Sequence, residues 1–321
     1  MLAAAEGKDP AAERKAERGA GTFADLHAKY LDYAKVKNKS WRQPERLIRR
    51  YAMPYWAKLA APSISYADVE TLLGRIAAPV LANQVLASIS AVFSWAVKKR
   101  ILPANPCRGI ERHKVKSRER ILSDSEVPRF WAAFDDAGLV ASSALRTILL
   151  TGQRPGEVSN MRHEHIVDGW WQMPGQPDPK VGWPGTKNGE SHRIWLPAPV
   201  QAIIAELTDD GETTGFVFPA ARGRRAVWGL DAAMREACKK LGVERATPHD
   251  LRRTHGSTIT ALGFGRDAMN RIQNHRDGGI ASVYDRHGYA KETKRVMDAV
   301  ASKIMALAEG RSAGGKVVPL R

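Results

Sequence analysis

The segment NHRDGGIASVYDRH, residues 274–287, is the most informative part of this sequence, and in it His275 precedes Tyr284 by nine residues. The chain has seven tyrosines, and five of them lie before residue 70. Only Tyr284 and Tyr289 fall in the second half. A tyrosine hydroxyl can act as a nucleophile when neighbouring side chains activate it. The residues around these two tyrosines are therefore the first candidates for chemistry.

A second polar cluster lies at the predicted start of a helix, in the segment TPHDLR. Thr247 suits the N-cap, Pro248 suits the first helical position, and Asp250 completes a capping box. His249 and Arg252 then lie three residues apart on one helical face. Because a helix N-terminus attracts anions through its N–H groups and dipole, this pair predicts a phosphate site. The alternative is a surface helix with incidental basic residues.

Arg154 lies in a predicted sharp corner between two helices. The first helix ends at Gly152 and Pro155 can begin the next, so the arginine side chain can be held and aimed. Glu157, one turn further on, can hold this corner or orient a guanidinium. Taken alone, an arginine near a turn is usually just solvated.

Three motifs in this order resemble the signature of the tyrosine recombinase (phage integrase) family. They are Thr-Gly-x-Arg-x-x-Glu at 151–157, His-x-Leu-Arg-Arg-Thr at 249–254, and the spacing from His275 to Tyr284. The ending Tyr-Asp-Arg-His-x-Tyr is similar to integrases of prophages and genomic islands. The resemblance covers roughly residues 22 to 287. It departs from the family at Gln273-Asn274, where Leu-Gly is usual.

The resemblance implies a site-specific DNA recombinase (integrase) that cleaves and rejoins DNA to integrate or excise a mobile element, with no cofactor and no metal. Tyr284 would be the nucleophile and would leave a 3′-phosphotyrosine, whereas Tyr289 would pack or cap. Arginines and histidines would stabilise the charge on the phosphate oxygens. The implied catalytic residues are Arg154, Lys187, His249, Arg252, His275 and Tyr284, with Glu157 in a supporting role.

In this family a lysine on a β-hairpin donates the proton to the leaving 5′-oxygen. Lys187 fits this role beside the Asn188-Gly189 turn, and Lys180 is its competitor. His192 lies on the same hairpin and is interpreted as structural.

A metal site built from His249, Asp250, His255 and His275 is disfavoured. His249 and His255 are six residues apart and so lie on different sides of one helix. His255 falls on an apolar helical stripe, which predicts a packed core histidine.

The charge balance favours a nucleic acid partner. Lys and Arg number 50 against 34 Asp and Glu, giving a net charge of +16. Such a field attracts polyanions, so double-stranded DNA is expected ahead of a ribosome-type or membrane-surface role. Cys107 and Cys238 are too few for a disulfide framework. With no signal peptide or uninterrupted apolar span, we expect a bacterial cytoplasmic, nucleoid-associated protein with no membrane partner.

The predicted fold is mainly α, with a helical core-binding domain and a mostly helical catalytic domain that contains a small antiparallel β-sheet. The expected boundaries are 1–21 for a linker or disordered N-terminus, 22–108 for the helical DNA-binding domain, 109–122 for a basic linker, 123–290 for the catalytic domain, and 291–321 for a C-terminal tail helix and flexible end. Strands are expected near 169–173, 185–187 and 193–196, and one helix is expected over 45–56.

Exposed basic residues in the first domain and the linker are candidate DNA contacts, although a solvated surface explains them equally well. They are Lys98, Lys99, Arg100, Lys114 and Lys116. The resemblance further implies a homotetramer on attachment sites, with DNA-bending or excision proteins as accessory partners. The apolar stripe in residues 291–309 either packs at home or docks on a neighbouring subunit.

Three rival functions are compatible with parts of this pattern. A type IB topoisomerase uses a similar residue set on one duplex, and a catalytically inactive DNA-binding regulatory factor would need only the basic surface. A metal-dependent nuclease is disfavoured, because clustered carboxylates with ligand spacing are lacking. Related integrases commonly carry an additional N-terminal arm-binding domain, and this sequence starts in what resembles the linker after it.

Overall fold

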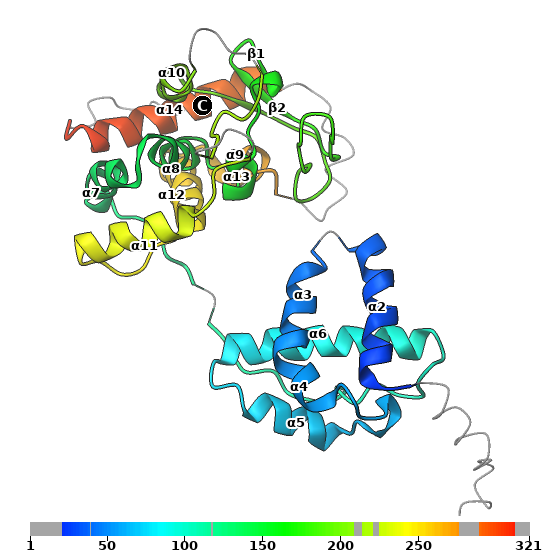
Figure 1. Cartoon of the computed structure of the whole chain (residues 1–321). Coiled ribbons are helices and arrows are strands. Elements are labelled where there is room, and N and C mark those ends of the chain that lie inside the picture. Colours follow the sequence, from blue (N-terminus) through cyan, green and yellow to red (C-terminus); the bar gives the residue numbers. More distant parts are fainter. Residues whose placement is uncertain are drawn as a thin grey trace, which may run out of the picture. The chain divides into compact units, whose positions relative to one another are not determined.

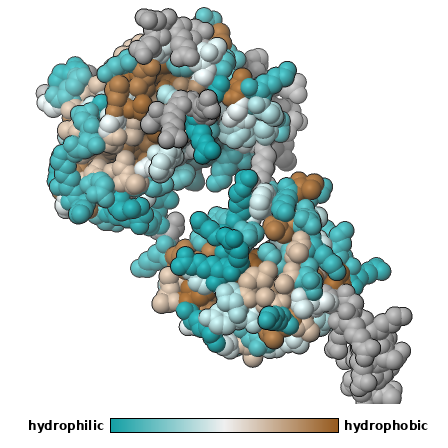
Figure 2. Space-filling model, viewed as in Figure 1, coloured by the Kyte–Doolittle hydropathy of each residue, from teal (hydrophilic) through white to brown (hydrophobic). Residues whose placement is uncertain are grey.

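The chain folds into two units that divide at residue 118 (Figure 1). Each unit has its own hydrophobic core. The boundary between the two units, 1–118 and 119–321, falls inside the segment predicted as a linker. The computed structural model describes residues 21–38, 40–116, 118–208, 214–220, 225–275 and 289–311. Hydrophilic residues make up much of the visible face of each unit (Figure 2), in keeping with the high charge content.

The N-terminal unit is helical. Its elements are α2 (Phe23–Lys37), α3 (Arg42–Leu47), a π-helical turn (Ile48–Ala52), α4 (Met53–Trp56), a 3-10 turn (Ala61–Ser63), α5 (Tyr66–Gly74) and α6 (Pro79–Lys98). Capping boxes at Thr22 and Ser65 begin α2 and α5. The helix predicted over 45–56 was wrong in detail, since it starts earlier and is interrupted by the π-helical turn. Pro54 explains the interruption, because it cannot donate the next backbone hydrogen bond.

Helix α6 is long and apolar enough to cross a membrane by length and composition. It packs against α2, α3 and α5 (Figure 1), and Val85, Ile89 and Phe93 on its apolar face are fully buried. Its buried Ser88 donates its hydroxyl to the Gln84 carbonyl at 2.7 Å, so this polar side chain is satisfied within the helix. We assign α6 as the core helix of the N-terminal unit.

The C-terminal unit is built around α8 and α12, which pack on each other, while α10 and α14 also pack on α8 (Figure 1). Its helices are α7 (Glu126–Ala133), α8 (Leu139–Thr151), α9 (Pro155–Ser159), α10 (Ala198–Glu206), α11 (Leu230–Leu241), α12 (Pro248–Ala261), α13 (Gly265–Ile272) and α14 (Ala290–Ala308), with 3-10 turns at Phe134–Ala137 and His163–His165. Ser123 and Glu126 exchange the two capping hydrogen bonds that their spacing predicts, at 2.9 and 3.2 Å.

A small antiparallel sheet lies beside these helices, in the order β1 (Ile166–Val167), β2 (Trp170–Met173) and β3 (His192–Trp195). Asp168 and Gly169, with φ of 49° and 75°, form the two-residue turn between β1 and β2. Residues 185–187 do not form the expected strand. The sheet has β1 as its additional strand instead.

Residues 174–191 form a loop that folds back on itself between β2 and β3. The Thr186 N–H donates to the Gly175 carbonyl at 3.2 Å, and a Cβ on Gly185 would lie 2.7 Å from the same oxygen. This close approach of two glycine backbones removes residues 185–187 from the sheet.

Helix α14 belongs to the core of its own unit. Val296, Val300 and Ile304 are buried, and the helix contacts α7, α8 and β3. The apolar stripe of residues 291–309 therefore packs at home, which disfavours its docking on a neighbouring subunit. The remaining tail, residues 312–321, lies outside the described residues.

Candidate active site

A cavity of about 590 Å³ in the C-terminal unit collects side chains from four separate segments. These segments are the corner between α8 and α9, the 174–191 loop, the first turn of α12, and the residues after α13. The lining residues are Arg154, Lys187, Asn188, His249, Arg252, Asn274 and His275. The structure thus brings together five of the six predicted catalytic residues. The sixth, Tyr284, lies outside the described residues.

Arg154 is held at the corner between α8 and α9. Gly152 ends α8 with a φ of 64°, and Arg154 is the extended N-cap residue of α9. The guanidinium donates through Nη1 to Glu157 Oε1 at 3.1 Å and through Nη2 to the Asn274 carbonyl at 2.8 Å. Glu157 is buried and accepts the hydrogen bond from the guanidinium, which limits the movement of Arg154.

Arg252 is a buried cation, with 6% of its surface exposed. It donates through Nη1 to the Gly152 carbonyl at 2.7 Å, and through Nη2 to the Gln273 carbonyl and to His275 Nε2 at 2.9 Å. Burial, followed by the nearby charge of Arg154, lowers the pKa of Arg252 to about 9. The guanidinium therefore remains charged at neutral pH and holds a fixed position at the cavity.

His275 accepts the hydrogen bond from Arg252, because a guanidinium can only donate. Its Nε2 must then be unprotonated in this arrangement, and Nδ1 carries the ring hydrogen. Nδ1 faces Asn270 Oδ1 at 3.4 Å. His275 is thus linked to Arg252 and lies in the lining of the cavity.

His249 projects from the first turn of α12, whose start is fixed by the predicted capping box between Thr247 and Asp250. Burial of the ring, and then the charges of Arg252 and Lys187, lower the pKa of His249 below its ordinary value. At neutral pH the imidazole is therefore mainly uncharged and able to accept a proton.

Lys187 is exposed at the cavity, and its backbone N–H donates to Glu157 Oε1 at 3.3 Å. Its competitor Lys180 lies on a separate turn, where its backbone N–H donates to Asp178 Oδ1 at 3.0 Å. Lys180 does not line the cavity. The geometry therefore favours Lys187 as the lysine of this site.

Several polar residues that the motifs did not single out connect these segments. Gln153 Nε2 donates to the Ile272 carbonyl at 2.8 Å, and Gln273 Nε2 donates to the Arg252 carbonyl at 2.8 Å. His192 also contacts the Ile272 carbonyl, at 3.0 Å, and burial lowers its pKa to about 4. The departure from the family pattern at Gln273-Asn274 is a sequence signal that could have drawn attention to Gln273.

The candidate metal ligands do not meet. Within the described ranges, no three histidine, cysteine or carboxylate side chains converge as a metal site requires. Asp250 accepts the capping bonds of Thr247, and His255 is fully buried against Gly152.

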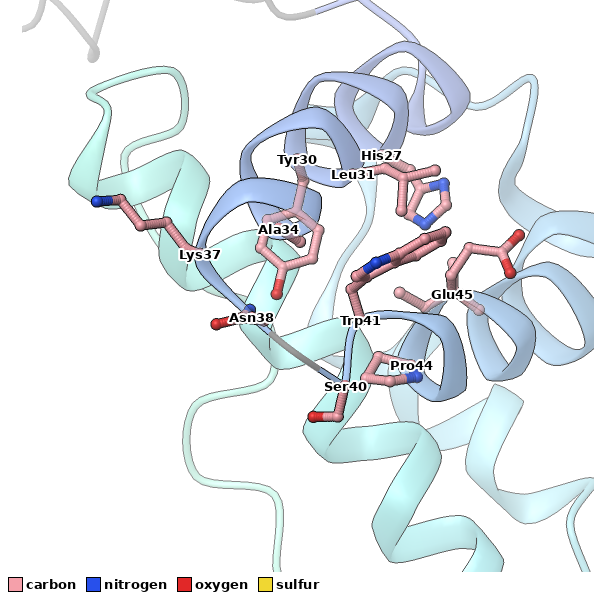
Figure 3. Close-up of a pocket in the computed structure, with 11 residues that line it drawn as sticks. His27, Tyr30, Leu31, Ala34, Lys37, Asn38, Ser40, Trp41, Pro44 and Glu45 are labelled. Carbon is pink, nitrogen blue, oxygen red and sulfur yellow. The ribbon is translucent and has the colours of Figure 1, made fainter. Parts of the chain in front are cut away.

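A smaller cavity of about 280 Å³ lies in the N-terminal unit between α2 and α3 (Figure 3). The rings of His27 and Trp41 lie beside Glu45 in its lining (Figure 3). Burial lowers the pKa of His27, which leaves this imidazole neutral. This lining does not concentrate positive charge as the cavity around Arg252 does.

Residues 120–291, which include all three motifs, match the phage integrase family. The chain belongs to the phage integrase family. Among similar proteins, the prophage integrase IntZ of Escherichia coli K12 is 25% identical over 282 residues, which cover 84% of this chain and 67% of IntZ. The shufflon-specific DNA recombinase of Escherichia coli is 28% identical over 273 residues, which cover 80% of this chain and 66% of that protein. This integrase-family chain thus spans about two thirds of the length of these relatives.

Solved integrases share the fold. A lambda integrase tetramer bound to a Holliday junction aligns with a TM-score of 0.67 at 16% identity, over 86% of this chain and 80% of that chain. The Tn1549 transposon integrase in complex with a circular intermediate DNA aligns with a TM-score of 0.62 at 16% identity, over 87% and 99% of the two chains. These findings confirm the predicted fold class and the assignment to the tyrosine recombinases, whose activity is site-specific DNA recombination.

Proposed function

We propose that this chain is a site-specific recombinase that cleaves and rejoins DNA through a 3′-phosphotyrosyl bond to Tyr284, in the integration or excision of a mobile element. The observation that carries the proposal is the convergence of Arg154, Arg252, His249 and Lys187 on one cavity of about 590 Å³. A phosphodiester under attack gains negative charge, which two fixed guanidiniums can stabilise.

The proposed reaction is a balanced phosphoryl transfer. The Tyr284 oxygen bonds to the scissile phosphorus while the bond from phosphorus to the 5′-oxygen breaks. Lys187 donates a proton to that leaving oxygen, and the neutral His249 can take the tyrosine proton. A 5′-hydroxyl of another strand then attacks the phosphotyrosine and releases Tyr284. The bond energy is kept throughout, so the reaction requires neither a nucleotide cofactor nor a metal.

Double-stranded DNA containing attachment sites is the proposed partner, and the proposed assembly on it is a homotetramer. The net charge of +16 supports a polyanionic partner, and the related lambda integrase is a tetramer on a Holliday junction. DNA-bending or excision proteins and a location in the bacterial cytoplasm belong to the same proposal. The proposed DNA contacts are all exposed: Lys98, Lys99, Arg100, Lys114 and Lys116.

The test is formation of a covalent adduct on nicked suicide substrates that carry candidate attachment sites, in the presence of EDTA. We expect wild type to give an adduct that survives denaturation and Tyr284→Phe to give none. Tyr289→Phe is the matched control, because the Tyr289 ring packs 4.0 Å from the Arg271 guanidinium, an arrangement that phenylalanine retains.

DNA binding without an adduct on any substrate, including a randomised library, would show that this chain is a DNA-binding factor without this activity. An adduct on single duplexes with relaxation of supercoils but no strand exchange between two sites would indicate the topoisomerase alternative instead. Strand exchange between paired attachment sites is the outcome that we expect.

A further inference from the structure

Two asparagine side chains join the lysine loop to the segment that carries His275. Asn188 Nδ2 donates to Asn274 Oδ1 at 3.0 Å, and Asn274 Nδ2 donates to Asn188 Oδ1 at 3.3 Å. Asn188 Nδ2 also lies 3.4 Å from the Asn274 carbonyl oxygen. The two amides thus form a reciprocal pair across the cavity wall, where both residues belong to the lining.

One member of the amide pair, Asn188, directly follows Lys187 in the sequence. Glu157 Oε1 accepts the backbone N–H of Lys187, and Asn188 is tied to Asn274, so the loop is anchored on both sides of the lysine side chain. Arg154 donates both to Glu157 and to the Asn274 carbonyl. The two anchors of the lysine loop are therefore also the two acceptors that hold Arg154.

The pair depends on the residue at position 274 in this chain. Asn274 has a φ of 49°, a left-handed conformation that favours glycine and, after it, asparagine. Glycine, the usual family residue at this place, would adopt this backbone and keep the carbonyl for Arg154, but it has no amide to offer Asn188. Asparagine therefore adds an interaction while preserving the turn.

We propose that the Asn188–Asn274 amide pair is a positioning clamp that holds the loop so that the Lys187 ammonium reaches the leaving 5′-oxygen. This inference rests on the proposed function. The clamp touches no reacting atom and acts through Lys187, so its removal should impair protonation of the leaving group and spare the attack on phosphorus. When the amide pair is formed, the loop that carries Lys187 is joined to the segment that carries His275.

The leaving atom provides a test that separates this role from general support of the fold. An alkoxide needs a proton to leave, whereas a thiolate leaves without one, because a thiol is a far stronger acid. A substrate with sulfur in place of the bridging 5′-oxygen should therefore bypass both Lys187 and the clamp that positions it. A defect in folding, DNA binding or charge stabilisation would persist on the sulfur substrate.

The experiment compares Asn188→Ala, Asn274→Gly and the double variant with wild type in the full chain, by single-turnover adduct formation. On the oxygen substrate we expect each single variant to be about 10- to 100-fold slower, part of the roughly 10²–10⁴-fold contribution of a general acid. We expect the double variant to be no slower than Asn188→Ala, which removes the amide pair together with the hydrogen bonds that Asn188 Oδ1 accepts from Thr186 Oγ1 at 3.1 Å and from the Glu190 N–H at 3.3 Å. On the sulfur substrate all three should fall within about threefold of wild type.

Two further variants frame the result. Lys187→Ala should show the same loss and the same rescue by sulfur. Gln176→Ala should show neither, although it removes a hydrogen bond from the same loop, in which Gln176 Nε2 donates to the Gly189 carbonyl at 3.2 Å. Thermal unfolding confirms that each variant is folded, and Asn274→Gly is the safeguard here, because glycine accepts the local backbone conformation.

Wild-type rates for the clamp variants on the oxygen substrate would overturn the clamp, and so would a loss that sulfur does not rescue. Loss with rescue in the clamp variants and none in Gln176→Ala supports it. Absence of an adduct with wild type on either substrate would instead mean that the proposed function itself has failed.

Discussion

At the scale of single residues, the site depends on one buried guanidinium that joins three segments. Arg252 binds the carbonyls of Gly152 and Gln273 and the ring of His275. Its neighbour Arg253 is 44% exposed and forms an ion pair with Asp250, three residues earlier on the same helix. Adjacent arginines of one helix thus differ completely in environment. A buried charge with several acceptors is costly to disturb, whereas an exposed pair contributes little.

The sequence predicted which residues meet here but not how they are held together. Arg154, His249, Arg252 and His275 follow from the resemblance of the three motifs to the family, and the first two motifs also encode a helix corner and a helix cap. The contacts between motifs, such as Gln153 with Ile272, are backbone-directed and join positions more than one hundred residues apart. No local pattern encodes such a contact, so the sequence did not predict it.

His255 makes the stability of the C-terminal unit sensitive to acid. Burial lowers the pKa of His255 to about 3 in the folded state, whereas an unfolded histidine titrates at about 6.5. Between these values the unfolded state binds the extra proton, so stability is fully present above pH 6.5 and is lost as pH falls toward 3. We expect a loss on the order of 1 kcal/mol per pH unit from this residue.

The measurement is urea unfolding of wild type and His255→Gln at pH 7, 6 and 5. The glutamine variant cannot titrate, so its stability should fall less steeply with acid, even though the substitution lowers stability at every pH. His113→Gln, at an exposed histidine of the N-terminal unit, should keep the wild-type slope. Parallel slopes for His255→Gln and wild type would contradict the assignment of this effect to His255.

At the scale of elements, the helices were predicted well because their start signals are local. Capping boxes at Thr22, Ser65 and Thr247 each begin a helix, and the helix start predicted at Thr247 is found there. The strand expected at 185–187 is absent because these residues form a loop instead. That loop depends on the close approach of Gly185 to the Gly175 backbone, ten residues earlier, which a local pattern does not reveal. The continuous helix expected over 45–56 was wrong for a different reason. Pro54 is visible in the sequence, but whether it produces a π-helical turn in the preceding residues depends on packing.

The corner between α8 and α9 should be intolerant of even one added methyl group. A Cβ on Gly152 would lie 2.3 Å from His255 Nδ1, and the φ of 64° disfavours any residue with a side chain. We therefore expect Gly152→Ala to lower the free energy of unfolding by about 2 kcal/mol or more. Because the Gly152 carbonyl also accepts from Arg252, adduct formation should fall as well.

Gly156→Ala is the matched control for that change. Gly156 lies four residues away, within α9, and a Cβ there would meet no atom within 4 Å. Alanine in a helix is favoured over glycine by about 0.5–1 kcal/mol, so this variant should be as stable as wild type or slightly more stable. Equal stability of the two variants in urea unfolding would refute the role given to the corner.

At the scale of the whole molecule, the segment that connects the two cores is exposed and rich in basic residues, which suits contact with a polyanion. Each unit has its own buried cluster, and residues 111–116 of the connecting segment are exposed and without helix or strand. If both units bind the same duplex, as the proposed function requires, the second binding step is intramolecular.

This arrangement predicts how DNA binding responds to salt. Each lysine that neutralises a phosphate releases counterions, so log K decreases as log salt increases. The magnitude of this negative slope should decrease by about one for each lysine–phosphate pair that a substitution removes. Lys114→Ala/Lys116→Ala and Lys98→Ala/Lys99→Ala should each reduce the slope by about two and weaken binding to specific and random duplexes alike. Lys240→Ala should leave the slope unchanged, because Lys240 is already paired with Asp136 at 2.6 Å. Fluorescence anisotropy at several salt concentrations measures these slopes, and wild-type slopes in both double variants would show that these lysines only solvate the surface.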